Sequence, residues 1–179
     1  MRREQRERLY AAIVASTVTR GYPATTVADL ISLAGLSRAT FYDHFGSKAD
    51  CLRATLEELL SAGLSLISDR LSGAGDPNQR SEQALLSLLE LVVRQPAAAR
   101  LCLVDAYSAG RAGLEPVDEA LEAACGLAHD ALKLLPDRSQ IPPEVPRAVI
   151  GGIHRVIYGS LARGEERALL REGSQLCRW

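Results

Sequence analysis

Residues 25–50 read TTVADLISLAGLSRATFYDHFGSKAD, and this stretch decides the fold. Its apolar spacing predicts one short helix over about 27–33 and a second over about 38–44. Between them, Gly35 can adopt the positive φ of a sharp corner, and Ser37 is a good N-cap residue for the second helix. We therefore expect two short helices joined at a steep angle by a tight turn, which is the helix-turn-helix arrangement.

The second of these helices divides its side chains between a core face and an open face. Phe41 and Phe45 are four residues apart and share one face, which we expect to be buried beside Leu36 in the turn. The remaining positions carry a guanidinium, a methyl, a hydroxyl, a phenol and an imidazole: Arg38, Ala39, Thr40, Tyr42 and His44. These groups suit the base edges and phosphates of the DNA major groove, into which the second helix of such a motif fits.

Individual roles follow from the chemistry of each side chain. Arg38, near the helix N-terminus, can donate two hydrogen bonds to guanine O6 and N7, and Ala39 can touch a thymine methyl group. Tyr42 and Lys48 are better suited to phosphates, which fix the register without reading the sequence. The alternative is a helical corner that carries these residues by chance.

The run Ser-x-x-Thr-Phe-Tyr-x-His-Phe-x-Ser-Lys-x-Asp fills residues 37–50, directly after Ala34-Gly35-Leu36. These motifs resemble the signature of the TetR family of transcriptional regulators, strongly over about residues 9–60 and elsewhere only in length and helix count. The resemblance implies a cap at Thr26 close to a phosphate and contacts with operator DNA at Arg38, Ala39, Thr40, Tyr42, His44 and Lys48. We add the second cap, Ser37, to this predicted DNA-binding set.

Two positions depart from the family pattern. Ser16-Thr17 stands where the family usually has a large apolar pair, so we expect looser packing of the first helix there. Ala49 stands where an acidic residue commonly follows the lysine, although Asp50 can provide a negative charge at the start of the long helix that follows.

The whole chain has helical periodicity, with no segment of strict alternation typical of strands. We expect an all-α, TetR-like fold of about nine helices. The resemblance implies a three-helix DNA-binding domain over residues 1–47 and a helical ligand-binding and dimerisation domain over 48–179. Besides the two short helices, the expected helices span about 4–20, 48–71, 79–95, 97–109, 116–135 (opening with Pro116), 147–163 and 165–177, with a proline-rich loop over 136–146. Because the chain ends in Cys177-Arg178-Trp179, we expect a short or truncated last helix.

The composition is ordinary for a globular protein, with 47% hydrophobic and 24% charged residues and a net charge of −1. Residues 1–50 hold seven basic and five acidic residues, a local net charge of +2. Four of the basic residues lie within the first eight positions, either as an arm or helical turn that reaches phosphates or as a solvated helix start: Arg2, Arg3, Arg6 and Arg8.

Several classes of site and location are not expected. The cysteines form no C-x-x-C pair, so we expect no metal or redox site but reduced, mostly buried thiols at Cys51, Cys102, Cys125 and Cys177. The N-terminus lacks the apolar core of a signal peptide, and no run is long enough to span a membrane. We therefore expect a cytosolic protein without membrane partners.

The resemblance also implies a pocket for a small-molecule effector. Its candidate residues are polar or aromatic side chains inside apolar helices: Cys102, Asp105, Tyr107, His129, His154 and Tyr158. Each has an ordinary alternative role at the edge of the core. Small residues at Gly151, Gly152 and Gly159, with Ser160, allow another helix to approach, either across a dimer interface or inside one subunit.

The helix-turn-helix predicts a homodimer that binds a palindromic operator, because one motif reads only a few base pairs and a dimer addresses two half-sites. The resemblance alone implies that this dimer is a repressor released by a small-molecule effector. We expect no catalytic residues and no cofactor, since the sequence has no H-E-x-x-H, P-loop or G-x-S-x-G motif. The alternative is a helical protein-interaction module without ligand control of DNA binding.

Overall fold

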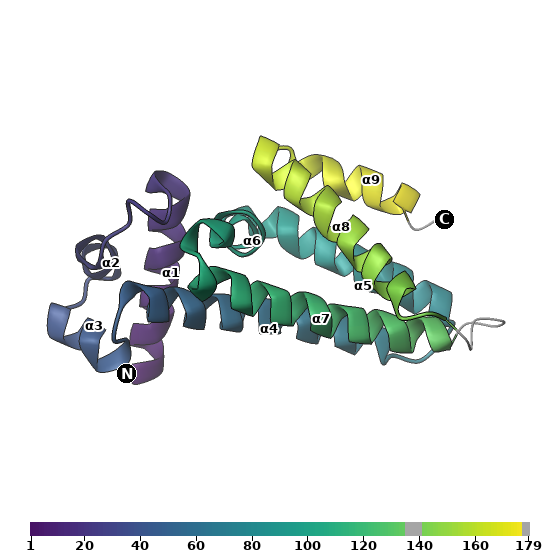
Figure 1. Cartoon of the computed structure of the whole chain (residues 1–179), viewed down its shortest axis with the longest axis horizontal. Helices are drawn as coiled ribbons and strands as arrows, with labels where there is room; N and C mark the ends of the chain where they lie inside the picture. The colour runs from purple at the N-terminus through teal and green to yellow at the C-terminus, as the bar shows by residue number, and fades with distance from the viewer. Residues whose placement is uncertain (135–140, 177–179) are drawn as a thin grey trace. The chain divides into compact units, whose positions relative to one another are not determined.

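The computed structural model describes residues 1–134 and 141–176, which form helices and connecting loops without a strand (Figure 1). The predicted all-α fold is confirmed, and nine α-helices and two 3-10 helices lie within the described ranges. None of these helices combines the length and apolar character that a membrane crossing needs. The elements are α1 (Arg2–Arg20), α2 (Val27–Ala34), α3 (Arg38–His44), α4 (Lys48–Leu71), α5 (Pro77–Arg94), α6 (Pro96–Leu103), η1 (Asp105–Ala109), α7 (Arg111–Lys133), α8 (Glu144–Arg163), η2 (Glu166–Ala168) and α9 (Leu169–Leu176).

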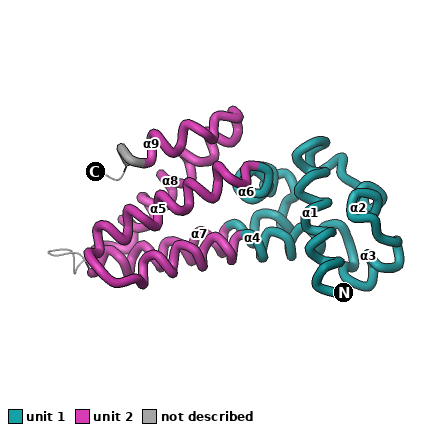
Figure 2. The backbone as a smooth tube through the Cα atoms, turned by 180° about the vertical axis from the view of Figure 1, so that it is seen from behind, with its two compact units in different colours: residues 1–59, 97–117 teal, residues 60–96, 118–179 magenta. Residues whose placement is uncertain are grey.

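The chain forms two compact units, which Figure 2 distinguishes by colour. Unit 1 consists of residues 1–59 and 97–117, and unit 2 consists of residues 60–96 and 118–179. The helices α4 and α7 each have their first part in unit 1 and the remainder in unit 2. The domain boundary that we predicted after residue 47 concerns independent folding and stays a prediction.

Local signals determine the short helices of unit 1. The hydroxyl of Thr26 accepts a hydrogen bond from the backbone N–H of Asp29 and so caps α2, and the Ser37 hydroxyl accepts from the N–H of Thr40 to cap α3. Gly35 has φ 59° and ψ 42°, the left-handed conformation that ends α2. The predicted positions of both helices and the predicted role of this glycine are therefore confirmed.

The core of unit 1 is apolar and lies between α1, α2, α3 and the first turns of α4. Phe41 is completely buried and Phe45 is 6% exposed, as their four-residue spacing predicted. Leu36, which we expected to bury in the turn, is only half-buried. Full burial of one leucine or phenylalanine contributes roughly 1.5–3 kcal/mol. The other fully buried large side chains here include Leu9, Ile13, Leu30, Leu52 and Leu56.

The polar pair of α1 lies inside this core. The Ser16 and Thr25 hydroxyl oxygens are 3.0 Å apart, and Thr25 donates its hydroxyl to the Gly21 carbonyl at 3.0 Å. The hydroxyl of Thr17 is buried without a hydrogen-bond partner among the described residues. Ser16 thus replaces apolar contact with a hydrogen bond, whereas an unsatisfied hydroxyl such as that of Thr17 costs about 1–3 kcal/mol.

Unit 2 joins α5, α8 and α9 around a second core. Asp76 caps α5, its side chain accepting a hydrogen bond from the Gln79 N–H at 3.0 Å. The Arg80 guanidinium donates to the carbonyl oxygens of Leu71 and Gly73 at 2.9 and 2.8 Å, which satisfies acceptors at the end of α4. The buried apolar side chains include Leu89 and Val92 of α5, Ile157 and Leu161 of α8, and Leu169 of α9.

Two prolines proved compatible with helices that we expected them to delimit. Helix α7 begins at Arg111, and Pro116 lies inside it rather than at its start. A proline there removes one internal hydrogen bond, while Arg111 stabilises the same turn through an ion pair with Glu115. Helix α8 begins at Glu144, so the loop predicted over 136–146 is wrong from that residue onward. Pro146 is the third residue of α8, where its missing N–H would have no partner within the helix.

The boundaries of the remaining helices differ less from those predicted from the sequence. The helix expected over 97–109 is a short α-helix, α6, followed by the 3-10 helix η1, and the last expected helix divides into η2 and α9. Residues 135–140 and 177–179, including the predicted C-terminal cysteine Cys177, lie outside the described residues.

Two glycines of α7 should respond oppositely to alanine. A Cβ at Gly113 would collide with the backbone carbonyl of Ala106 in η1, whereas a Cβ at Gly126 would meet nothing within 4 Å. We expect Gly113→Ala to destabilise the protein by about 1–3 kcal/mol through overpacking. Gly126→Ala should stabilise it by about 0.5–1 kcal/mol through helix propensity. Urea unfolding of both variants checks this, and equal effects would contradict the packing of η1 on α7.

Candidate DNA-binding interface and ligand groove

The start of α2 is fixed by a reciprocal cap. The Asp29 carboxylate accepts hydrogen bonds from the Thr26 backbone N–H at 2.8 Å and from the Thr26 hydroxyl at 2.7 Å. Arg20 of α1 forms an ion pair with the same carboxylate at 3.0 Å. The hydrogen bonds from Thr26, chiefly the one from its hydroxyl, lower the pKa of Asp29. Thr26 is exposed, and the anion bound at this helix N-terminus is the Asp29 carboxylate of the chain itself.

The turn between α2 and α3 is fixed from outside the motif. The Arg8 guanidinium of α1 donates a hydrogen bond to the carbonyl oxygen of Gly35 at 3.1 Å. The N–H of Leu36 also donates to the Ile31 carbonyl at 3.0 Å, closing the end of α2. Sequence reasoning missed the contact from Arg8, because the two residues are 27 positions apart and carry no local signal.

Helix α3, from its N-cap to Tyr42, brings together five of the predicted DNA-binding residues. Arg38 and Ala39 are exposed in its first turn, and Tyr42 is 47% exposed one turn later. The Arg38 guanidinium carbon lies 5.6 Å from the centre of the Tyr42 ring, within the range of a cation–π contact. Tyr42 in turn packs edge-on against Phe41, with ring centres 5.3 Å apart. The hydroxyl oxygens of Thr40 and Ser37 are 2.9 Å apart.

His44 is directed toward α1. Its Nε2 lies 3.1 Å from the Gln5 side-chain oxygen, and the His44 ring is half-buried. Nearby, the Arg6 guanidinium lies 5.6 Å from the ring centres of both Tyr10 and Phe45. The contact between His44 and Gln5 ties the end of α3 to the first turns of α1, so His44 has a clear positioning contact in addition to the predicted one with DNA.

Lys48 joins the first turn of α4 to the loop before α2. Its ammonium donates to the carbonyl oxygens of Tyr22 and Thr25 at 2.9 and 2.6 Å, and lies 4.1 Å from the centre of the Tyr22 ring. Partial burial lowers the pKa of this lysine. Two of the three N–H donors therefore bind protein carbonyls, which leaves one for the phosphate predicted from the sequence.

The basic N-terminal residues belong to α1 and do not form an extended arm. Arg3 forms an exposed ion pair with Glu7 at 3.1 Å, Arg6 donates to the Tyr10 hydroxyl, and Arg8 binds the turn. Three of the four arginines thus contact this chain itself, and Arg2 remains exposed at the helix start.

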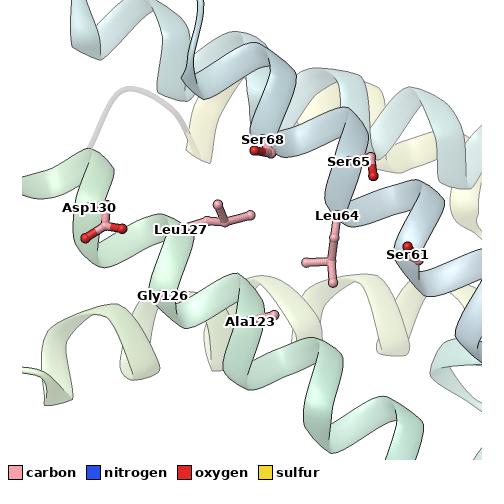
Figure 3. Close-up of a pocket in the computed structure, with 8 residues that line it drawn as sticks. All are labelled: Ser61, Leu64, Ser65, Ser68, Ala123, Gly126, Leu127 and Asp130. Carbon is pink, nitrogen blue, oxygen red and sulfur yellow. The ribbon is translucent and has the colours of Figure 1, made fainter.

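Unit 2 contains a groove between α4 and α7, with a volume of about 420 Å³. Figure 3 shows Leu64 and Leu127 projecting into the space between the two helices. Sequence reasoning missed this groove, although serines spaced at three and four residues along one helix were a signal for a polar face. Its other lining residues are Ser61, Ser65 and Ser68 of α4 and Ala123, Gly126 and Asp130 of α7.

The pocket residues predicted from the sequence lie elsewhere. Cys102, Asp105 and Tyr107 belong to α6 and η1 in unit 1, whereas His129, His154 and Tyr158 belong to α7 and α8 in unit 2. None of the six lines the groove. Their role in binding a ligand therefore stays a prediction.

Several of these groups are buried. Burial raises the pKa of the Asp105 carboxyl, although Arg100 lies 3.4 Å away and lowers it. The Nδ1 atom of His129 is buried without a hydrogen-bond partner in the described part of the chain. Burial also raises the pKa of the Cys51 and Cys102 thiols to about 12, which makes both unreactive at neutral pH. Within residues 1–134 and 141–176, no group of three His, Cys, Asp or Glu side chains could hold a metal ion.

The three glycines predicted for a dimer interface differ in surroundings. Gly151 and Gly152 are exposed, and a Cβ at either would meet nothing within 4 Å. Gly159 is buried, and a Cβ there would lie 3.1 and 3.3 Å from guanidinium nitrogens of Arg155 and Arg163. The first two are thus open to a partner, whereas the third is covered by its own chain.

Lys48 provides a direct test of how the motif is held. Lys48→Gln removes the charged hydrogen bonds to Tyr22 and Thr25, so we expect a loss of about 1.5 kcal/mol in the free energy of unfolding. The matched control is the only other lysine, the exposed Lys133, and Lys133→Gln should change the free energy by less than about 0.5 kcal/mol. Urea unfolding measures both, and equal losses would contradict the anchoring contact.

Comparison with known proteins agrees with this geometry. Residues 9–55, which contain α2, α3 and most of α1, match the family model described as bacterial regulatory proteins, tetR family. Among curated proteins, none is significantly similar in sequence.

Solved structures resemble the chain along its whole length. The transcriptional regulator FadR from Bacillus subtilis, in complex with stearoyl-CoA, has a TM-score of 0.81 at 14% identity, covering 96% of each chain. A TetR-family transcriptional regulator from Pectobacterium atrosepticum has a TM-score of 0.74 at 21% identity, covering 99% of this chain and 92% of its own. NalD from Pseudomonas aeruginosa, the secondary repressor of the MexAB-OprM multidrug efflux pump, has a TM-score of 0.79 at 15% identity, covering 99% and 96%. Residues 9–55 are thus similar to the DNA-binding motif of the tetR family of bacterial regulatory proteins, and the chain has the fold of solved TetR-family regulators.

Proposed function

We propose that this chain is a homodimeric transcriptional repressor that binds a palindromic operator through α3 and is released from it by a small-molecule effector. The observation that carries the proposal is the exposed face of α3, where Arg38, Ala39 and Tyr42 stand free of the core while Phe41 anchors the helix. The family match over residues 9–55 supports DNA as the partner of this face.

Each group on this face has a distinct part in binding. Arg38 reads guanine through two hydrogen bonds, and Ala39 lies beside it for contact with a thymine methyl. The Tyr42 hydroxyl, one hydroxyl of the Ser37–Thr40 pair and the remaining N–H of Lys48 donate to phosphates, and the start of α2 beside Thr26 lies close to one. Arg38 and Lys48 are the only cationic side chains in this proposed set, and of the two only Arg38 contacts a base, so specificity for the operator sequence depends strongly on Arg38.

A second copy of the chain is the occupant that fits the exposed apolar stripe of α8. Val145 and Val149 are 41% and 47% exposed, and both lie on one helix face with Gly152 because they are spaced by four and three residues. Leu170 of the following helix α9 is 39% exposed. Two such stripes packed against each other would bury these side chains and pair two reading helices for two half-sites.

Control by an effector is proposed from the groove in unit 2 and from the named relatives. The Bacillus subtilis regulator was solved with stearoyl-CoA, and NalD is a repressor. The helices α4 and α7 that line the groove both extend into the unit that contains α3. An effector that weakens DNA binding must itself bind more weakly to the DNA complex, because the coupling is reciprocal.

Arg38 allows the reading role to be tested. We expect Arg38→Ala to lower discrimination at one base pair per half-site by about 1–3 kcal/mol while leaving preferences elsewhere intact. Selection of bound sequences from a random duplex pool, followed by fluorescence anisotropy titrations, measures this. Arg94→Ala, an exposed arginine at the end of α5, is the control. Unchanged preference in the Arg38 variant would overturn the reading role, and binding without salt dependence would favour the protein-interaction alternative.

The proposed dimer is tested by two valines of similar exposure. Val149→Lys places a charge in the stripe on α8, so we expect a monomer and at least a tenfold loss of affinity for a two-half-site operator, about 1.4 kcal/mol. Val18→Lys alters a residue of α1 that is 43% exposed and should leave the dimer intact. Sedimentation equilibrium distinguishes the outcomes. If Val149→Lys remained a dimer, the interface could not be the stripe on α8.

A further inference from the structure

We propose that the groove between α4 and α7 is the effector site and that it takes an organic cation with a short apolar body. This inference rests on the proposed function, because it names the chemical class of that function's effector. Three features of the eight lining residues carry it: an apolar floor, unengaged hydroxyls and a single unpaired carboxylate.

The floor of the groove is apolar. Leu64 of α4 and Leu127 of α7 project into the space between the helices, and the small residues Ala123 and Gly126 continue the α7 wall (Figure 3). The volume of about 420 Å³ admits a ligand of a few apolar carbons with a headgroup. Several lining residues are exposed, so a bound ligand would stay partly in contact with water.

The three serines of the groove have hydroxyls that nothing else uses. Ser61, Ser65 and Ser68 recur at four and three residues and therefore lie along one face of α4. None of their three side-chain hydroxyls forms a hydrogen bond with a described residue. Elsewhere in the same structure, the hydroxyls of Thr55 and Ser81 bond back to the carbonyl four residues earlier. The groove hydroxyls are instead available to a polar group on a ligand.

Asp130 supplies the only formal charge among the lining residues. Its carboxylate forms neither an ion pair nor a hydrogen bond with any described residue, and its side chain is exposed. The surrounding surface has the same sign, because residues 118–133 of α7 contain four acids and one base: Asp118, Glu119, Glu122 and Asp130 against Lys133. Glu122 is neutralised by an ion pair with Arg147 at 3.1 Å.

The lining of the groove favours a ligand with a positive charge over one with a negative charge. No arginine, lysine or histidine lines the groove, so a carboxylate or phosphate headgroup would meet no counter-charge and would be repelled by Asp130. A cationic nitrogen beside Asp130 gains attraction instead. Because Asp130 is exposed, solvent screens the pair and the preference is expected to be modest, about fivefold in affinity. The predicted ligand thus differs in charge from the stearoyl-CoA of the Bacillus subtilis structure.

Three probes with the same apolar tail test the proposal on the full chain: octyltrimethylammonium, octanoate and 1-octanol. Isothermal titration calorimetry should give the tightest binding for octyltrimethylammonium, at least about fivefold tighter than for octanoate, with 1-octanol between them. The preference should shrink in high salt, since an exposed ion pair is screened. Equal affinities, tighter binding of octanoate, or no binding of octyltrimethylammonium would overturn the proposal.

Matched variants locate the binding. Asp130→Asn keeps the size of the side chain and should remove most of the preference for the cation, whereas Asp118→Asn, on the same helix but outside the groove, should keep it. Ser65→Ala tests the hydroxyl wall and should weaken binding of the cationic probe less than Asp130→Asn does. An equal response of the two aspartate variants would overturn the assignment to this groove.

Measurements of DNA binding distinguish a failure of this inference from a failure of the proposed function. Titration of the chain with random duplex at two salt concentrations uses no probe, and lack of salt-dependent binding would refute the proposed function alone. With duplex bound, octyltrimethylammonium should reduce the affinity for DNA in the unmodified chain and less so in Asp130→Asn. Binding of the probe through Asp130 without any change in DNA affinity would overturn the effector role of the groove.

Discussion

The left-handed backbone at Gly35 is the constraint on which the DNA-facing surface depends. This single conformation sets the direction in which α3 leaves α2, and Arg8 of α1 holds the turn through the Gly35 carbonyl. Once the direction is set, Phe41 reaches the core and the opposite side of α3 remains open. Lys48 adds a second anchor, from α4 to the loop that precedes α2. The motif is thus a short segment whose geometry is maintained by helices on both sides of it in the sequence.

The sequence predicted those features that have a local cause. The caps at Thr26 and Ser37, the positive φ of Gly35 and the buried spacing of Phe41 and Phe45 each depend on residues within four positions, and all were confirmed. Contacts of long sequence separation could not be predicted in this way. The pairs of His44 with Gln5, Arg8 with Gly35 and Lys48 with Tyr22 connect residues 39, 27 and 26 positions apart. Such contacts follow only after the helices have packed.

Prolines and polar residues explain the other differences between sequence and structure. Proline in the sequence predicts a helix boundary, but α7 accommodates Pro116 at the loss of one hydrogen bond, and α8 accommodates Pro146 at a position whose N–H has no partner in the helix. Polar side chains that interrupt apolar helices are the ligand residues predicted from the sequence. The groove is instead lined by several serines on one face of α4, together with leucines. Its serines lie on a mixed helix face, and only the approach of α7 turns that face into a wall.

The contact between Arg38 and Tyr42 lowers the entropy cost of the proposed contact between Arg38 and a base. An exposed arginine ordinarily samples many rotamers and loses up to about 2 kcal/mol of conformational entropy when it is fixed against a base. Here the guanidinium already rests over an aromatic ring whose own position is fixed by Phe41. Part of the ordering of Arg38 is thus complete in the unbound protein, so the proposed DNA complex would lose less conformational entropy on forming.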